Sequence, residues 1–240
     1  PVSKFHYKLL VVTGLGWMFD AMDTGIISFV LPSLAKAWAL TAIEMGYIGS
    51  VGLLGMALGA VLAGSVADRF GRKAVFAVTL LIYSIATGLC GLAWNFESLL
   101  IFRFLVGFGL GGELPVAVTL MTEFSPPAAR GKMIVLLESF WGAGWLAAAM
   151  ISYLIIPEYG WRVAFFIGAI PALYVLYIRM AVPESVRYLL DKGRLMEAHK
   201  IVSMIERVSG IDPIEAAVEP TRRKNIRTAF ADLWTPQFMK

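Results

Sequence analysis

The sequence has few of the residues that build disulfides and metal sites. Among its 240 residues the only cysteine is Cys90, so the chain forms neither an internal disulfide nor a cysteine-based metal site. Its two histidines, His6 and His199, lie far apart in the sequence and give no clustered ligands. We therefore expect neither a bound metal nor any other cofactor.

Charged residues are also scarce. They make up 16% of the chain, against about 25% in average globular domains. Hydrophobic residues make up 58%, and the mean hydropathy is +0.73. This composition excludes an ordinary soluble domain. The net charge of +4 does not indicate nucleic-acid binding, because the basic residues flank apolar stretches instead of forming one patch.

Six long apolar stretches dominate the chain, and each can cross a bilayer core, which takes about 20 helical residues. Most of the 21 lysines and arginines lie at the N-terminus, in the loops 68–73 and 125–132, and after the last stretch. Lys36 and Arg162 lie on the opposite side, and Arg103 lies within a stretch. By the positive-inside rule both ends of the chain are cytoplasmic. The expected spans are residues 8–32, 45–67, 74–94, 98–122, 132–156 and 162–182.

The loop between the second and third spans reads G-x-x-x-D-R-x-G-R-K from Gly64. A merely solvated turn would not need these ordered glycines and this acid. The pattern resembles the signature loop between helices 2 and 3 of the major facilitator superfamily of secondary transporters. In that family the loop gates conformations and does not touch the substrate. The resemblance therefore implies conformational roles for Gly64, Asp68, Arg69, Gly71 and Arg72, and we expect Glu123 to pair with Arg72 or Arg130 as a latch.

A polar segment follows the sixth span. Its P-E-S-x-R-Y-L run from Pro183, followed by G-R-x-x-E-A, resembles the sugar-porter-like branch of the superfamily, although Val186 replaces the usual proline. Apolar residues between Leu195 and Ile205 recur at helical spacing and predict a surface helix. The resemblance implies an all-α membrane protein, with residues 1–182 forming six transmembrane helices in two three-helix repeats. Residues 183–240 would form a cytoplasmic linker to a C-terminal six-helix half that would complete a twelve-helix fold.

Ionisable residues inside the spans are candidates for substrate or proton binding, because a charge at the bilayer centre costs about 2.5–3.5 kcal/mol. Asp20 lies roughly 18 Å beyond Lys8 along a helix, near the midplane, and Asp23 lies one turn further on the same face. A proton-coupled carrier needs a protonatable carboxylate at this depth. The alternative is a carboxylate that only bonds a neighbouring helix. The candidates are Asp20, Asp23, Arg103, Glu113 and Glu138.

Glycines are concentrated in the second and fourth spans. The fourth contains G-x-G-x-x-G from Gly107, but a dinucleotide site needs a preceding strand, so we reject that interpretation. The run instead resembles the superfamily's fourth helix. Arg103 in the same span could either attract an anionic substrate or hold a partner acid. The second span has a small-residue stripe suited to close helix contact, namely Gly46, Gly49, Gly52, Gly55 and Gly59.

In the fifth span, Glu138, Trp141 and Trp145 share one helix face. Such a stripe is usually lipid-facing or packed in the core. Because an intramembrane acid accompanies the two tryptophans, the face is also a candidate cavity wall, and tryptophan would stack a flat aromatic ligand.

Three motifs, G-W-M-F-D-A-M-D from Gly16, L-G-G-E-L-P from Leu110 and L-L-E-S-F-W from Leu136, resemble the bacterial niacin transporters of the superfamily. They are also similar to synaptic vesicle glycoprotein and organic-ion relatives and to aromatic-acid/proton symporters. The resemblance implies proton-coupled uptake of a small aromatic monocarboxylate such as nicotinate across a bacterial inner membrane. It matches Asp20 to the acid of helix 1 and Trp141 to the pocket aromatic of helix 5.

Two other functions stay open, whereas an enzyme is not expected. A sugar substrate agrees with the motif after Pro183, but the tryptophans, the acids and Arg103 fit a flat charged molecule better. A membrane sensor that binds without transporting would keep the same midplane carboxylates. An enzyme would need a histidine cluster, a metal-ligand set or a serine elbow, and the chain has none of these motifs. It also lacks the G-x-x-x-x-G-K-[ST] loop of ATP-driven pumps.

Overall fold

The computed structural model describes residues 2–174, 177 and 182–210, apart from the side chains of residues 114 and 115. It contains five helices long and apolar enough to cross a membrane, which confirms the all-α membrane class. A shorter helix, α6 (Trp161–Gly168), begins the sixth expected span, whose last part lies outside the described residues. The five are α1 (Lys4–Trp38), α2 (Ala42–Phe70), α3 (Arg72–Gly91), α4 (Phe96–Phe124) and α5 (Arg130–Tyr159).

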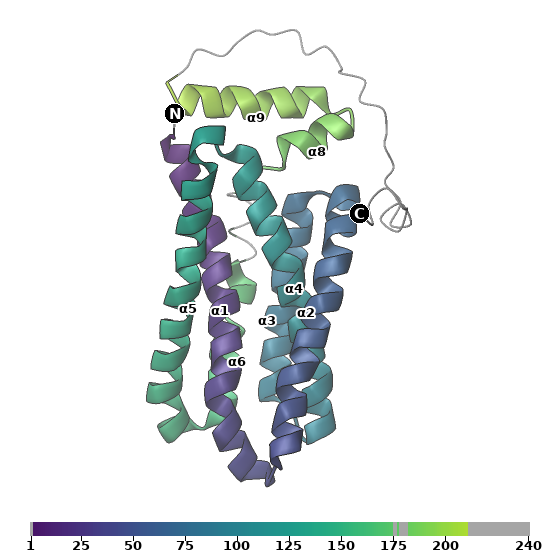
Figure 1. The fold of residues 1–240 in the computed structure, drawn as a ribbon, viewed down its shortest axis with the longest axis vertical. Coiled ribbons are helices and arrows are strands. Elements are labelled where there is room, and N and C mark those ends of the chain that lie inside the picture. Colours follow the sequence, from purple (N-terminus) through teal and green to yellow (C-terminus); the bar gives the residue numbers. More distant parts are fainter. Residues whose placement is uncertain (1, 175–176, 178–181, 211–240) are drawn as a thin grey trace, which may run out of the picture.

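The long helices run side by side as one upright bundle (Figure 1). Helix α2 packs along α4, α3 packs against α4, and α1 packs along α5, so the helices form two groups. Two short helices, α8 (Val186–Asp191) and α9 (Leu195–Val208), lie across the end of the bundle that also holds the N-terminus (Figure 1). Helix α9 is the predicted surface helix.

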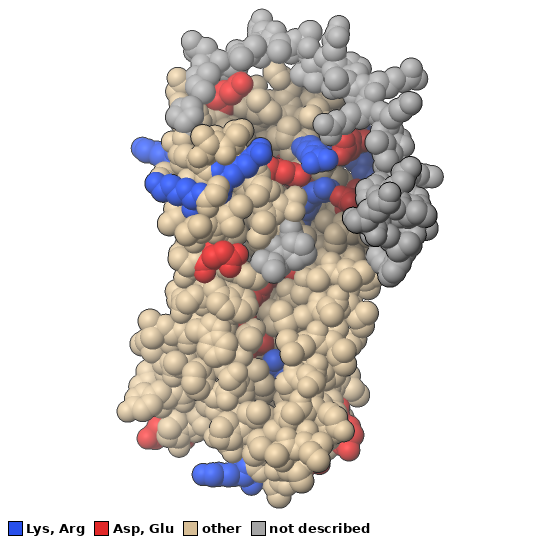
Figure 2. Space-filling model, in the orientation of Figure 1, with Lys and Arg blue, Asp and Glu red and all other residues tan. Residues whose placement is uncertain are grey.

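Charged side chains are unevenly distributed over the face of the molecule shown in Figure 2. They gather near the end that carries α8 and α9 and at the opposite tip, with a band of mostly uncharged side chains between them. This band has the surface that a bilayer core requires, because a lipid-facing charge has no water to solvate it.

Helix α1 extends further than expected. The expected end at Pro32 was wrong, because the helix continues through this proline to Trp38. A transmembrane helix tolerates proline where its neighbours satisfy the freed backbone groups. The chain then turns through Ala39, which has a φ of 51°. Helix α2 begins with a capping box, in which the Thr41 N–H donates to Glu44 Oε2 over 2.8 Å and the Glu44 N–H donates to Thr41 Oγ1 over 3.3 Å.

The contact between α2 and α4 is made by backbone. A Cβ added at Gly55 would meet the backbone of Phe104 and Phe108, and one added at Gly59 would meet the Phe108 carbonyl group. By contrast, a Cβ at Gly49 would find nothing within 4 Å among the described residues. The predicted glycine stripe therefore divides: Gly52, Gly55 and Gly59 face α4, whereas Gly46 and Gly49 face away from it.

We predict that Gly59→Ala destabilises the protein, because the added methyl group must push α2 away from α4. Overpacking of this kind costs about 1–3 kcal/mol. The matched control is Gly49→Ala, which adds the same methyl group to the same helix and should leave stability unchanged or slightly raised. Thermal unfolding of the whole protein in detergent measures both. Equal melting temperatures for the two variants would contradict the proposed contact.

Candidate functional site

Two buried polar clusters lie next to each other along α1. The first joins Asp20 of α1, Tyr83 of α3 and Glu113 of α4, all buried and close enough to interact electrostatically. Within the described part of the chain, the carboxyl oxygens of both acids and the Tyr83 hydroxyl have no hydrogen-bond partner of acceptable geometry. A Cβ on Gly16 would lie 2.6 Å from Glu113 Oε1, so this glycine makes room for the acid. Two buried carboxyl groups this close disfavour the state in which both are charged.

The second cluster is an ion pair with a hydroxyl group. Arg103 Nη1 of α4 donates to Asp23 Oδ2 of α1 over 3.2 Å, and both side chains are buried. Thr87 of α3 donates its hydroxyl hydrogen to Asp23 Oδ1 over 2.5 Å. Of the two roles that the sequence left open for Arg103, the structure shows that of holding a partner acid. The cluster joins three helices through one carboxylate.

A cavity of about 270 Å³ opens between α1, α2, α4 and α5. Two indole rings lie on its wall: the ring centroids of Trp17 and Trp141 are 4.7 Å apart, with 42° between the ring planes. Trp17 Nε1–H donates to Glu138 Oε2 over 3.3 Å, which fixes one ring and holds this acid beside the pocket. The lining residues are Trp17, Asp20, Thr24, Met56, Ala57, Ala60, Leu110, Gly111 and Trp141.

The structure separates the residues that the sequence grouped as binding candidates. Asp20 and Trp141 line the cavity, whereas Glu113 lies behind Asp20 and the Asp23–Arg103 pair forms the neighbouring cluster. The remaining candidate tryptophan, Trp145, is outside the cavity. Its side chain is 36% exposed and packs edge-on against a phenylalanine of α1 at 6.4 Å.

Among the lining residues that α1 contributes, sequence reasoning missed Trp17 and Thr24. Together with Asp20 they recur at i, i+3 and i+7 on α1, the same spacing that singled out the fifth-span residues. That spacing was available as a signal in the sequence.

The segment Glu184–Tyr188 docks on the turn between α2 and α3. Glu184 Oε1 accepts hydrogen bonds from the N–H groups of Arg72 at 2.9 Å and Lys73 at 3.3 Å, so its carboxylate caps the start of α3. The Tyr188 hydroxyl donates to the Arg69 carbonyl oxygen over 3.2 Å. The segment therefore holds the signature loop by its backbone.

The charged side chains of the loop pair differently from the prediction. Arg72 forms a 2.7 Å ion pair with Asp68 one turn earlier. Among the described residues, Glu123 forms no ion pair with Arg72 or Arg130, so the expected pairing was wrong. Glu123 instead accepts a hydrogen bond from the hydroxyl group of Ser185 in the docked segment. The guanidinium of Arg72 is already engaged, and Arg130 bonds a backbone carbonyl oxygen.

We predict that Arg103→Gln destabilises the protein strongly, because it leaves the Asp23 carboxylate buried without its partner. Breaking a buried pair in this way costs about 3–5 kcal/mol. The double variant Asp23→Asn/Arg103→Gln removes both charges and should recover part of that loss. Thermal unfolding of the whole protein should be measured for Asp23→Asn, Arg103→Gln and the double variant. If the effects of the two single changes simply add, the two side chains do not pair directly.

The two glycines of the signature loop provide a second test. Gly71 has a φ of +101°, and a Cβ there would meet Glu184 and Tyr188. We predict that Gly71→Ala loosens the docked segment and speeds protease cleavage after residue 182. Gly64→Ala is the control, because a Cβ there has nothing within 4 Å in the described structure. Equal cleavage rates in the two variants would show that Gly71 does not hold the segment.

The sequence and the structure match known transporters. The model of the sugar (and other) transporter family matches residues 11–233. The niacin transporter NiaP of Acinetobacter baylyi is 57% identical over 241 residues, which cover 100% of this chain and 55% of that protein. The benzoate transport protein of the same organism is 35% identical over 198 residues, covering 80% of this chain and 42% of the relative.

The structure is similar to the xylose transporter XylE from E. coli in a partially occluded inward-open conformation. The TM-score is 0.76 at 23% sequence identity, with 86% of this chain and 56% of that one covered. This likeness concerns the fold. The chain spans about half the length of the curated relatives it matches.

Proposed function

The chain belongs to the sugar (and other) transporter family of the major facilitator superfamily, and we propose that the whole protein takes up a small aromatic monocarboxylate such as nicotinate together with protons. The family consists of integral membrane transporters rather than enzymes, and the chain corresponds to the N-terminal half of their fold. One observation carries the substrate class: two indole rings in contact with each other and a buried carboxyl group line the same cavity.

Trp17 and Trp141 suit a flat heteroaromatic ring. Their faces are inclined to each other by 42°, so a ligand ring can stack on one and contact the edge of the other. The other walls come from small or apolar residues of α2 and α4, which leave space without competing for hydrogen bonds. The similarity to a niacin transporter over the full length of this chain supports the same substrate class.

Asp20 links the substrate to the proton. When this carboxyl group is protonated, it donates a hydrogen bond to a bound anion. When it is ionised, it repels the anion. Binding of the proton and of the carboxylate therefore favour each other, and Glu113 provides a second group to which the proton can move. Alternating access would follow from rocking this half against a C-terminal half around the shared site.

Arg103 is not available as the counter-charge for the substrate in this structure, because it is buried against Asp23. We infer that a donor from the C-terminal half faces the carboxylate of the substrate. Asp23 and Arg103 then act as positioning residues, which hold α1 so that Asp20 lines the cavity.

The orientation follows from charge. The excess of lysine and arginine at the end with α8 and α9 supports a cytoplasmic location for both ends of this chain. The similarity to a bacterial transporter supports a bacterial inner membrane. Residues 1–182 then form the membrane bundle, and residues 183–240 form the linker to the second half. The docked Glu184–Tyr188 segment holds the signature loop on that side, where Asp68, Arg69 and Arg72 would act as gating residues.

We predict that Asp20→Asn in the whole protein abolishes gradient-driven accumulation of nicotinate, because the amide cannot bind and release a proton. Thermal stability should change little, since the carboxyl oxygens of Asp20 have no hydrogen-bond partner among the described residues. Proteoliposomes with and without an inward proton gradient provide the assay, with Asp191→Asn on the exposed surface of α8 as the control. Normal accumulation by Asp20→Asn would remove Asp20 from the coupling mechanism.

The tryptophans test the substrate class. Trp141→Ala should raise the KM for nicotinate several-fold, because stacking on an aromatic ring is worth about 0.5–1.5 kcal/mol. Trp145→Ala lies one helix turn away, outside the cavity, and should leave KM unchanged. Benzoate should compete with nicotinate, and hexoses should not. Accumulation of hexoses in place of nicotinate would assign the protein to sugar transport, and binding without accumulation would indicate a sensor.

A further inference from the structure

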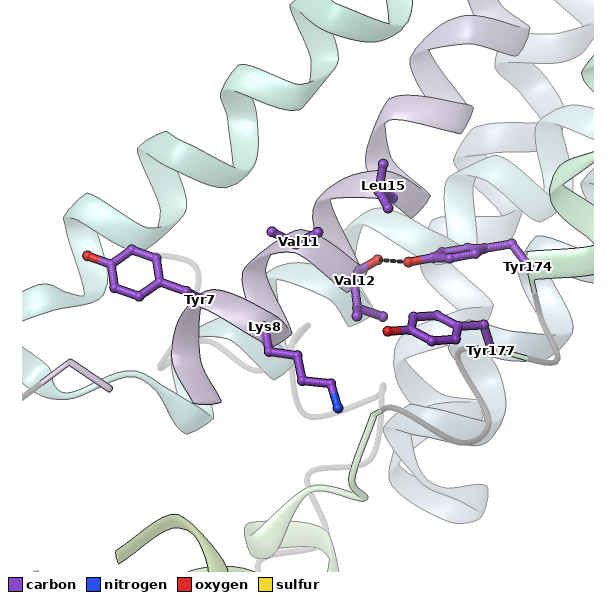
Figure 3. A pocket seen from close by; sticks show the side chains of 7 residues that line it. All are labelled: Tyr7, Lys8, Val11, Val12, Leu15, Tyr174 and Tyr177. Carbon is purple, nitrogen blue, oxygen red and sulfur yellow. Dashed lines mark hydrogen bonds between the residues drawn. The ribbon is translucent and has the colours of Figure 1, made fainter. Parts of the chain in front are cut away.

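A second hollow lies between the first turns of α1 and the chain that follows α6. It measures about 610 Å³ and is open to the surface. Figure 3 labels the residues that line it. None of its residues belongs to the cavity of Trp17 and Asp20. We call it the α1 groove, and its lining residues are Tyr7, Lys8, Val11, Val12, Leu15, Tyr174 and Tyr177.

The far wall of the groove is a fixed pair of tyrosines. The Tyr174 hydroxyl donates to the Val12 carbonyl oxygen over 3.1 Å, which ties this wall to α1. The Tyr177 ring stacks on Tyr174, with centroids 5.6 Å apart and 29° between the planes. The groove thus has a floor on α1 and an aromatic side that the Tyr174 hydrogen bond ties to this helix.

The groove is polar at one end and apolar along the rest. In Figure 3 the Lys8 ammonium group lies toward the end at which α1 begins, and the Tyr177 hydroxyl group points toward α1 beside Val12. Val11, Val12 and Leu15 then follow along the helix, over a rise of about 10 Å from Lys8. Lys8 forms no ion pair with any described residue. Within the part of the chain that the structure describes, the cation at the end of this apolar groove therefore has no counter-charge.

The groove faces away from the transport cavity. Lys8, Val11 and Leu15 lie on the side of α1 opposite to Trp17, Asp20 and Thr24, separated by about half a turn at 3.6 residues per turn. The cavity side is where the second half of the fold is expected, so the groove side faces the bilayer.

We propose that the α1 groove is a binding site for an anionic phospholipid. The phosphate lies against the Lys8 ammonium group and the Tyr177 hydroxyl, and an acyl chain lies along Val11, Val12 and Leu15 between α1 and the tyrosine pair. The order of polar and apolar groups along the groove matches that of a phospholipid, and a lysine near the start of a membrane helix reaches toward the headgroup layer. The inference goes beyond the transport function and does not depend on the substrate.

Charge favours an anionic lipid over a zwitterionic one. Phosphatidylethanolamine carries its own ammonium group next to its phosphate, which weakens the attraction of Lys8. Phosphatidylglycerol has no such group. A soluble phosphate lacks the acyl chain that would fill the apolar trough, so it should bind far more weakly.

Native mass spectrometry of the whole purified protein tests the site, with phosphatidylglycerol, phosphatidylethanolamine and glycerol phosphate titrated separately. The wild type should bind phosphatidylglycerol in preference to phosphatidylethanolamine and should not retain glycerol phosphate. Lys8→Gln should weaken phosphatidylglycerol binding about fivefold, the effect of one basic residue at a membrane surface. Lys36→Gln, at the other end of α1, is the matched control and should bind like the wild type.

Leu15→Trp tests the trough separately from the charge. It fills the groove, keeps Lys8 and should reduce binding of both phospholipids. Equal affinity for the two lipids in the wild type, or unchanged phosphatidylglycerol binding in Lys8→Gln, would overturn the proposal. Loss of lipid binding in Leu15→Trp alone would show that the groove is apolar packing space without headgroup selectivity. Nicotinate uptake by Lys8→Gln is measured separately. Retained uptake would show that the transport proposal stands whether or not the lipid site does.

Discussion

The buried ion pair between Asp23 of α1 and Arg103 of α4 joins two groups of helices. We call the contact between these groups the seam, and the rest of the structure depends on it. Helices α1 and α5 pack as one group and α2, α3 and α4 as another. Helix α6 packs against α1, α3 and α5, and α1 also contacts α4 directly. In a bilayer the hydrophobic effect that joins helices in water is absent. Close packing of small residues and polar contacts must therefore hold the two groups of helices together. The glycines of α2 and α4 supply the packing within one group, and the Asp23–Arg103–Thr87 cluster supplies a polar contact between the groups.

The candidate cavity follows from the same seam. Its tryptophans come from α1 and α5, whereas its small residues come from α2 and α4, so a shift of one group against the other changes its shape. The ion pair fixes α1 one helical turn from Asp20 and so sets where that carboxyl group points. At the end of the bundle with α8 and α9, the docked Glu184–Tyr188 segment ties α2, α3 and α4 together by their backbones and by Glu123. Both tie points resist motion within this half, which suits a unit that rocks as one body.

The helices were predictable because their signal is long and local. Apolar stretches of the required length, bounded by charge, placed five long helices and the start of a sixth. The first span was predicted too short, because α1 continues through Pro32, which a helix in a membrane bundle can accommodate. Side-chain partners were less predictable. Arg103 could be matched to either an acid or a substrate from sequence, and only the fold shows which carboxylate lies within reach. Glu123 was matched to a nearby charge, but the docked segment brought a hydroxyl group from 62 positions away.

Asp20 and Asp23 show that the position of a carboxylate along a membrane helix does not by itself determine its role. They lie one turn apart on the same helix at similar depth, and both are buried. Asp23 meets a cation and a hydroxyl group, so its charge is compensated and it holds helices together. Asp20 meets another carboxyl group and a phenol, and no described group compensates a negative charge there. Protonation of Asp20 removes this uncompensated negative charge, and a nearby hydrogen-bond donor would stabilise it. An anionic substrate adds a second negative charge unless a proton arrives with it. The proposed coupling of proton and substrate therefore follows from the different neighbours of the two acids. Asp23 has a cation beside it, whereas Asp20 has none among the described residues.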